Sequence, residues 1–297
     1  MERKIAALKV QDRALKLLSK ELSGRGFIQL MPVMLSTATD PLGPDPGSSV
    51  ITIPTVNYLG QELVITQSML LQKQVAVASG IDRLFIVSPN VRLEDSERRA
   101  SGRHLFEFSQ LDFEISYGTM DDVMTLIEDI VVSTMMYITE TCSSELKAWG
   151  RKLRVPVKPF KKYTTHELEA EYGSDWEAIS SKRAKEPFWV LCHKREFYER
   201  ESPPGHYRNF DLIWPEGFGE ALSGSEREWE YDRLRQKIDT DGLSDKYTSY
   251  LEYAKKGLIP SAGAGLGVER LTRFLVGAKH VGDVQLFRRV PGESVKI

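Results

Sequence analysis

An arginine-rich hairpin carries the residue types in this sequence that are best suited to chemistry on a phosphate. Arg92-Leu93-Glu94 ends one expected strand, and Phe108 lies in the return strand. The turn between them carries Arg98, Arg99 and Arg103. Arginine binds phosphate through paired N–H groups, and a cluster of arginines neutralises a triphosphate. A solvated surface loop is the simpler explanation of such a turn, so the hairpin predicts a nucleotide site only together with other features.

The alternation of residue types predicts that both strands of this hairpin belong to one sheet. Over 85–94 and 105–115, apolar residues share one face and polar residues share the other. A polar face of this composition is not typical of a plain surface strand, so we expect it to line a site. The polar face consists of Ser88, Asn90, Arg92, Glu94, Gln110, Asp112 and Glu114, together with Ile86 and Phe108.

A glycine-rich segment downstream complements the hairpin. Residues 263–267, Gly-Ala-Gly-Leu-Gly, are expected to form a strand that runs into a helix with Leu271, Phe274 and Leu275 at helical spacing. Arg270 then lies in the first turn of that helix, where free backbone N–H groups and the helix dipole favour phosphate. The pattern alone is a weak signal, because it does not match the dinucleotide fingerprint G-x-G-x-x-G.

Together, and in this order, the two elements resemble motifs 2 and 3 of the class II aminoacyl-tRNA synthetases, which hold ATP against an antiparallel sheet. The resemblance implies an α/β (α+β) fold, an antiparallel sheet flanked by helices, as one catalytic domain over 1–297 with a peripheral insertion around 143–186. It implies that Arg92 and Arg270 are catalytic, that Arg103 and His104 reach the distal phosphates, and that Phe108 and Arg270 sandwich the adenine. The implied ATP site comprises Arg92, Glu94, Arg103, His104, Phe108, Glu220, Gly265 and Arg270.

Two further segments indicate an anionic amino acid as the second substrate. Residues 67–74, Gln-Ser-Met-Leu-Leu-Gln-Lys-Gln, resemble the Q-S-P-Q-x-x-K-Q segment of aspartyl-tRNA synthetases, whose lysine binds the substrate's side-chain carboxylate. Residues 110–114 match the aspartyl version of the strand in which an aspartate, here Asp112, supports that lysine. Asparaginyl enzymes usually have glutamate at the position of Asp112 and no lysine at that of Lys73. A solvated helix face is the alternative explanation of Lys73.

Residues 219–228 resemble the G-E-x-x-G-G-S-x-R-E element of asparaginyl-tRNA synthetases. The resemblance implies that Glu220 and Ser223 bind the Mg²⁺ that bridges the ATP phosphates, and that Arg227 contacts the amino acid. Because Glu220 and Ser223 are three residues apart, an ideal strand would point them to opposite faces. We therefore expect a bulge or kink near Ser223-Gly224.

Departures from the aspartyl pattern favour a different product. Met69 and Leu70 replace a Pro-Gln pair whose glutamine holds the α-amino group in the tRNA enzymes, and residues 40–47 replace their flipping loop. We expect Lys73 and Arg227, with Ser68, to hold the α-carboxylate. Asp40, Gln110 or Asp112 would take the α-amino group, which leaves the β-carboxylate at phosphorus. The expected aspartate site comprises Asp40, Ser68, Lys73, Gln110, Asp112 and Arg227.

No room is expected in this chain for an anticodon-binding domain. The resemblance therefore points to the archaeal-type asparagine synthetases, with aspartate, ATP and ammonia as substrates, Mg²⁺ as cofactor and no tRNA. A helix with Leu15, Leu18 and Leu22 and a strand ending at Pro32 resemble motif 1, which implies a homodimer through these elements. The alternatives are an enzyme that charges tRNA, a truncated paralogue that aminoacylates another acceptor, and a regulatory paralogue that binds an amino acid without ATP turnover.

Composition limits the kinds of partner and the cellular compartment that can be expected for this chain. The net charge of −2 and pI of about 6.3 give no support for a nucleic-acid surface. Two cysteines in 297 residues indicate a reducing compartment rather than a disulfide framework. The sequence shows no membrane-length apolar run and no apolar signal core near its N-terminus. These features predict a cytoplasmic enzyme that is not bound to a membrane.

Overall fold

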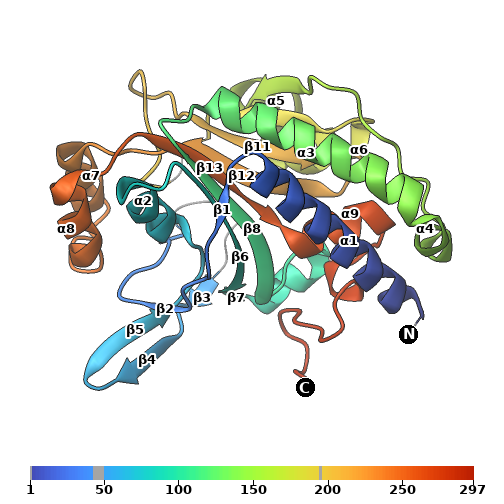
Figure 1. The fold of residues 1–297 in the computed structure, drawn as a ribbon, viewed down its shortest axis with the longest axis horizontal. Coiled ribbons are helices and arrows are strands. Elements are labelled where there is room, and N and C mark those ends of the chain that lie inside the picture. Colours follow the sequence, from blue (N-terminus) through green and yellow to red (C-terminus); the bar gives the residue numbers. More distant parts are fainter. Residues whose placement is uncertain (1, 43–49, 194–195) are drawn as a thin grey trace.

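The computed structural model describes residues 2–42, 50–193 and 196–297. Within them an eight-stranded sheet has the order β1-β6-β8-β13-β12-β11-β10-β9 (Figure 1). The interior pairs are antiparallel, and the outer pairs β1–β6 and β9–β10 are parallel. This confirms the predicted fold class. The strands are β1 Ile28–Gln29, β6 Arg83–Val91, β8 Glu107–Ser116, β9 Lys161–Thr164, β10 Phe188–Leu191, β11 Asn209–Trp214, β12 Gly219–Glu226 and β13 Ser261–Gly267.

Four helices form a layer against the sheet: α1 Glu2–Gly24, α3 Met120–Thr141, α4 Ser143–Trp149 and α9 Val268–Val276 (Figure 1). α1 contributes Ala14, Leu18 and Leu22 to the main core, and α9 buries nearly its whole length. A capping box between Thr119 and Asp122 starts α3, which continues to Thr141. This layer fixes one face of the sheet, so the site must use another part of it.

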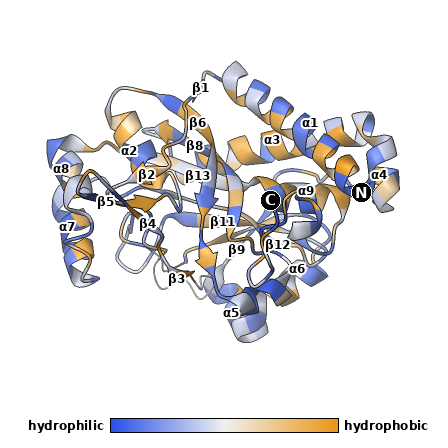
Figure 2. Cartoon of the chain, turned by 90° about the horizontal axis from the view of Figure 1, so that it is seen from below, coloured by the Kyte–Doolittle hydropathy of each residue, from blue (hydrophilic) through white to orange (hydrophobic). Residues whose placement is uncertain are grey.

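A second group of helices lies at the other end of the sheet: α2 Leu70–Ala78, α7 Tyr231–Thr240 and α8 Thr248–Gly257 (Figure 1). They share a separate apolar cluster that includes Leu71, Phe197, Tyr247 and Tyr250. The outer surface of α7 is hydrophilic, as expected for a helix with solvent on one side (Figure 2). α2 carries Lys73 from this cluster towards the sheet.

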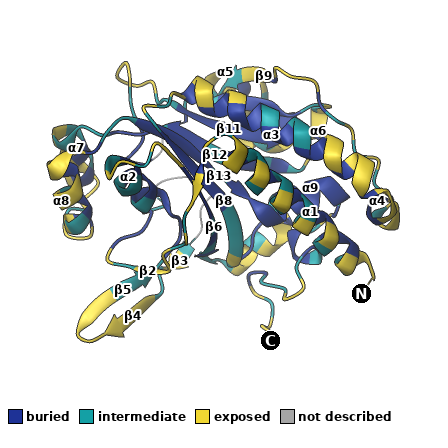
Figure 3. Ribbon diagram, in the orientation of Figure 1, coloured by how far each residue is buried: buried dark blue, intermediate teal, exposed yellow. Residues whose placement is uncertain are grey.

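A small sheet of β2 Leu35–Ser36, β5 Gln61–Ile65 and β4 Thr55–Tyr58 stands away from the main body (Figure 3). Its β4–β5 hairpin is largely exposed, with Leu59 at the turn. β3 Val50–Thr52 pairs with β7 Leu93–Glu94 at the base of the arginine-rich turn. Residues 43–47 of the expected replacement for the flipping loop lie outside the described residues.

The segment 143–186 is less peripheral than the sequence suggested. Its strand β9 forms an edge of the main sheet, and its helices α5 Thr165–Tyr172 and α6 Trp176–Arg183 pack nearby. Its α6 also contacts β11 and β12, which brings Glu177 to the site described below. A charged stretch had masked these roles in the sequence. No helix among the described residues is long and apolar enough to span a membrane.

Candidate active site

The pairing of β8 with β13 builds the floor of the site. Gln110, Asp112 and Glu114 of β8 lie opposite Gly267, Gly265 and Gly263 of β13, so each of these three polar residues faces a glycine. The glycines make room for these side chains: a Cβ at Gly265 would lie 2.9 Å from both Asp112 Oδ1 and Gln110 Nε2, and one at Gly263 would overlap the Glu114 carboxylate. The glycine-rich pattern therefore serves neighbouring side chains as well as any ligand.

Two buried cations lie at one end of this floor. Lys73 Nζ is 3.0 Å from Asp112 Oδ1 and 3.7 Å from Glu114 Oε2, and the lysine side chain is 2% exposed. Arg227 donates from Nε and Nη2 to the two oxygens of Glu114, at 3.0 and 3.1 Å. Burial lowers the Arg227 pKa, but the Glu114 carboxylate outweighs it, so the pKa rises above its usual value. The solvated-face explanation of Lys73 is therefore wrong.

An acidic wall faces these cations. Both carboxylate oxygens of Asp40 accept hydrogen bonds from the Tyr198 hydroxyl, at 3.1 and 3.2 Å, and Asp40 is 5% exposed. Burial raises the pKa of Tyr198, which keeps the hydroxyl as a donor. Glu196, Glu199 and Ser68 line the same cavity. One end of the site thus offers both positive and negative groups to a zwitterionic amino acid.

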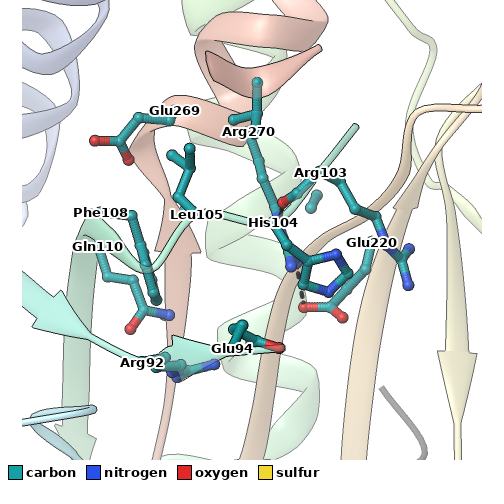
Figure 4. Close-up of a pocket in the computed structure, with 14 residues that line it drawn as sticks. Arg92, Glu94, Arg103, His104, Leu105, Phe108, Gln110, Glu220, Glu269 and Arg270 are labelled. Carbon is teal, nitrogen blue, oxygen red and sulfur yellow. Dashed lines mark hydrogen bonds and ion pairs between the residues drawn. The ribbon is translucent and has the colours of Figure 1, made fainter. Parts of the chain in front are cut away.

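The other end of the site carries the predicted arginines (Figure 4). Arg92 donates from Nε to the Gln67 carbonyl at 3.2 Å, and its guanidinium lies 5.2 Å from the centre of the Phe108 ring. Arg270 donates from Nη1 to Glu220 Oε1 at 2.9 Å. In this structure it is the guanidinium of Arg92, and not that of Arg270, that lies over the Phe108 ring. The predicted adenine sandwich between Phe108 and Arg270 stays a prediction.

His104 is an uncharged member of this end. Burial lowers its pKa to about 2, with further lowering by the positive charges of Arg270, Arg103 and Arg98. Its Nδ1 lies 2.6 Å from the Ser101 hydroxyl. At neutral pH His104 is therefore a hydrogen-bonding group and not a cation.

A bulge in β12 brings the two candidate metal ligands together. Glu220 pairs with Ile213 and Leu222 pairs with Leu212, which leaves Ala221 as the extra residue. Ser223 then donates to Glu220 Oε1 at 3.3 Å. The expected irregularity exists, but it lies at Ala221 rather than at Ser223-Gly224. Two neighbouring hard-oxygen ligands suit a Mg²⁺ that takes its remaining ligands from phosphates and water.

Glu177 of α6 is a site residue that the sequence analysis missed. Its carboxylate oxygens accept from both Nη atoms of Arg103, the second bond at 3.2 Å, and Oε1 also accepts the backbone N–H of Glu220 at 3.0 Å. Glu177 thus ties the arginine-rich turn to β12. Nothing in the composition of 143–186 could have found it, because the contact joins residues 74 positions apart.

The site residues line two adjoining cavities that share Arg92, Gln110, Glu220 and Gly265. Arg99 of the turn does not line them and instead pairs with Glu293 at 3.4 Å. All the residues predicted for ATP, aspartate or Mg²⁺ line one or both cavities: Asp40, Ser68, Lys73, Arg92, Glu94, Arg103, His104, Phe108, Gln110, Asp112, Glu220, Ser223, Arg227, Gly265 and Arg270.

Comparison with known families agrees with this geometry. Residues 2–291 match the family of class II tRNA synthetases (D, K and N). The chain belongs to this class II tRNA synthetase family. Membership makes it an ATP-dependent ligase of the class II synthetase type.

Known relatives place this class II chain near the aspartate and asparagine enzymes. It is 31% identical to the aspartate–tRNA(Asp/Asn) ligase of Methanopyrus kandleri over 96% of this chain and 67% of the relative. It is 30% identical to the asparagine–tRNA ligase of Thermococcus gammatolerans, over 97% and 70% of the two chains. The asparaginyl-tRNA synthetase of Pyrococcus horikoshii, solved with asparaginyl-adenylate, superposes with a TM-score of 0.86 at 25% identity, over 99% of this chain and 70% of the other.

Proposed function

We propose that this chain is an ammonia-dependent asparagine synthetase. Aspartate and ATP give β-aspartyl-adenylate and pyrophosphate, and ammonia then gives asparagine and AMP. The observation that carries the proposal is the charge pattern of the amino-acid cavity. Lys73 and Arg227 lie at its floor, Asp40 lies on its wall, and apolar Leu70 lines it where the tRNA enzymes resembled by 67–74 place a glutamine for the α-amino group.

This pattern favours one orientation of aspartate. The α-carboxylate lies at Lys73 and Arg227, and the α-ammonium turns away from Leu70 towards Asp40. The β-carboxylate is then the group that points along the cavity to Arg92 and the nucleotide end. Held in this way, aspartate would be activated on its side chain, which is the activation that asparagine synthesis requires.

Catalysis would rest on positioning and on stabilisation of charge. A β-carboxylate oxygen attacks the α-phosphorus and pyrophosphate leaves. Arg92 offsets the charge that develops at the α-phosphate, while Arg103 and neutral His104 bind the leaving phosphates. Ammonia then attacks the acyl carbon of the mixed anhydride, AMP leaves with the bonding electrons, and the ammonium nitrogen loses a proton to become the amide.

Glu220 and Ser223 would hold Mg²⁺ at the phosphates. The ion would supply a positive charge that draws electron density from the phosphoryl oxygens. Arg270, which pairs with Glu220 in this structure, would be released from that carboxylate and become available to the nucleotide.

The deciding experiment is a product assay. Purified protein is incubated with aspartate, ATP, Mg²⁺ and ammonium, with and without tRNA. We expect free asparagine, AMP and pyrophosphate at a rate that tRNA does not change. Exchange of pyrophosphate into ATP without free asparagine would contradict the proposed acceptor and leave the adenylation in place.

The variant Leu70→Gln tests the orientation of aspartate. A glutamine here restores an amide acceptor for the α-amino group and should favour the orientation of the tRNA enzymes, so asparagine formation should fall about tenfold while adenylate formation persists. The control is Leu59→Gln at the exposed β4–β5 turn, which should match the wild type. Equal rates in both variants would refute the proposed orientation.

Charging of tRNA is the second candidate, because both closely matching relatives described above are named for it. On that alternative the assay with tRNA yields aspartyl- or asparaginyl-tRNA and little free asparagine.

A further inference from the structure

We propose that Ser88 and Asn90 of β6 are positioning residues that fix the side-chain amide of Gln110 with its N–H groups towards the cavity. Gln110 lines both the nucleotide and the amino-acid cavity. A wall that offers only donors there selects an acceptor oxygen, which we assign to a carboxylate of the substrate. That this substrate is aspartate rests on the proposed function.

A short chain of hydrogen bonds links these residues. Lys73 Nζ lies 3.0 Å from Asp112 Oδ1, and the Ser88 hydroxyl donates to Asp112 Oδ2 at 2.8 Å. Asn90 Nδ2 is 3.5 Å from Ser88 Oγ and donates to Gln110 Oε1 at 2.7 Å. Ser88 and Asn90 are both fully buried, so water cannot replace these partners.

The proton positions follow from the carboxylate at the start of this chain. The Asp112 carboxylate, paired with the Lys73 ammonium, can only accept hydrogen bonds. The Ser88 hydroxyl must therefore donate its single hydrogen to Asp112. Ser88 Oγ is then left as an acceptor on the side of Asn90, and Asn90 turns its NH₂ to that side. The same NH₂ donates to Gln110 Oε1, which leaves Gln110 Nε2 at the other end of the amide.

The reversed arrangement is disfavoured on chemical grounds. Turning Asn90 over would place Oδ1 against Ser88 Oγ, whose hydrogen is already committed to Asp112, and would bury both hydrogens of Nδ2 without a partner. In the observed arrangement Asn90 Oδ1 is the buried atom that lacks a hydrogen-bond partner in the described part of the chain. One bare carbonyl oxygen costs less than a bare NH₂ group together with a carbonyl oxygen that faces Ser88 Oγ and Gln110 Oε1.

Gln110 Nε2 accordingly faces the open side. It lies 2.9 Å from the point where a Cβ of Gly265 would be, so the missing side chain of Gly265 keeps the amide accessible. Figure 4 shows the nitrogen of Gln110 directed towards Arg92 and the centre of the cavity. An ammonium group would meet N–H donors here and be repelled, whereas a carboxylate oxygen would be bound. Gln110 is therefore excluded as the group that binds the α-amino group of aspartate, and Asp40 is favoured for that role.

The variant Asn90→Asp tests the proposal because it reverses the direction of the hydrogen bond between residue 90 and Gln110. An aspartate at 90 offers only acceptors, so Gln110 must turn its NH₂ towards it and present Oε1 to the cavity. The dissociation constants of aspartate, asparagine and isoasparagine are measured by calorimetry. We expect aspartate to bind at least about tenfold more weakly. Asparagine and isoasparagine each replace one carboxylate of aspartate with an amide. The one whose amide takes the place of the carboxylate that contacts Gln110 should gain about tenfold in affinity relative to the other.

Two controls separate this reversal from an added charge. Asn57→Asp, on the exposed β4 strand, carries the same change and should leave all three constants unaltered. Simple repulsion by a new buried charge would weaken aspartate but change both monoamides equally, and that result, or no change at all, would overturn the proposal. If Asn90→Asp does not fold, Ser88→Ala removes the acceptor that orients Asn90 and should shift the same ratio in the same direction by about threefold.

Because these measurements need no turnover, they are independent of the product assay. A wild-type protein that binds aspartate without making asparagine would refute the proposed function, while the ratio of monoamides would still decide the role of Asn90. A wild-type protein that binds none of the three amino acids would overturn both.

Discussion

Gly265 lies directly opposite Asp112 in the ladder between β13 and β8, and the carboxylate of Asp112 occupies the space that a side chain at Gly265 would need. Asp112 in turn pairs with Lys73, whose buried side chain lines the same cavity as Asp40 and Ser68. The backbone of β13 therefore sets, through Asp112 of β8, the position of a cation that comes from helix α2.

This relationship predicts the effect of Gly265→Ala. The new methyl group would displace Asp112 and Gln110, because it lies 2.9 Å from both, and the unfolding free energy should fall by about 1–3 kcal/mol. Adenylate formation should fall further than stability explains, which pyrophosphate exchange and urea unfolding on the same samples would reveal. Gly24→Ala is the matched control, since a Cβ there meets no atom within 4 Å. Normal exchange in Gly265→Ala would contradict the assigned role.

Glu269 predicts a pH dependence of stability. Burial raises the pKa of its carboxyl to about 7, against about 4.5 for the ordinary group, although the backbone N–H of Ser109 partly offsets this. The folded protein therefore binds the proton more tightly than the unfolded chain. The contribution of the Glu269 carboxyl to the free energy of unfolding is therefore complete below pH 4.5 and is lost as the pH rises through 7.

The comparison with Glu269→Gln isolates this effect. Relative to the variant, the wild type should lose about 3 kcal/mol of unfolding free energy between pH 4.5 and pH 8. Urea unfolding across this range measures the difference, and the variant at exposed Glu62, Glu62→Gln, should follow the wild type. Parallel curves for wild type and Glu269→Gln would show that Glu269 titrates normally.

Glu177→Gln should act on ATP and not on aspartate. The amide can still accept the N–H of Glu220, but it no longer holds Arg103 by charge. Because this ion pair is partly exposed, its loss is worth about 1 kcal/mol, and we expect the KM for ATP to rise roughly fivefold. Steady-state kinetics in each substrate provide the measurement, with Glu169→Gln on the exposed side of α5 as the control. Equal increases of both KM values would indicate general damage instead.

The predicted homodimer has a direct test at Met31. This side chain is 84% exposed in a segment that also exposes Ile28, Val33 and Leu35, and such an apolar strip is typical of an interface. Met31→Asp should place a charge in that interface and shift the protein towards the monomer, which sedimentation would measure. Val157→Asp, at a side chain 79% exposed elsewhere, should leave the assembly unchanged. A wild-type monomer would refute the predicted dimer.

Local patterns predicted the parts of the site that follow from strand alternation. Arg92, Gln110 and Asp112 share a face because the period of a strand is two residues, and Arg270 follows a strand into a helix as its sequence suggested. The resemblance gave Lys73 a role at the substrate with a solvated helix face as the alternative, and the structure excludes the solvated face because the side chain is buried.

Features that depend on distant contacts escaped prediction. The position of the bulge at Ala221 is set by how β12 pairs with β11, and Glu177 reaches the site only because β9 and α6 pack at the edge of the sheet. The arrangement of Arg92 over Phe108 likewise depends on side-chain packing that no spacing rule describes.

The alternation of glycine with larger residues in β13 also has a consequence for folding. If β13 slipped by one residue along β8, Gly265 would face Phe113 or Leu111, and Leu266 would be forced against the polar groups that the glycines now accommodate. Misaligned pairing would thus bury uncompensated charge while leaving apolar side chains unpacked. The glycines of β13 and the polar residues of β8 that line the site therefore also favour the correct register of the two strands as the chain folds.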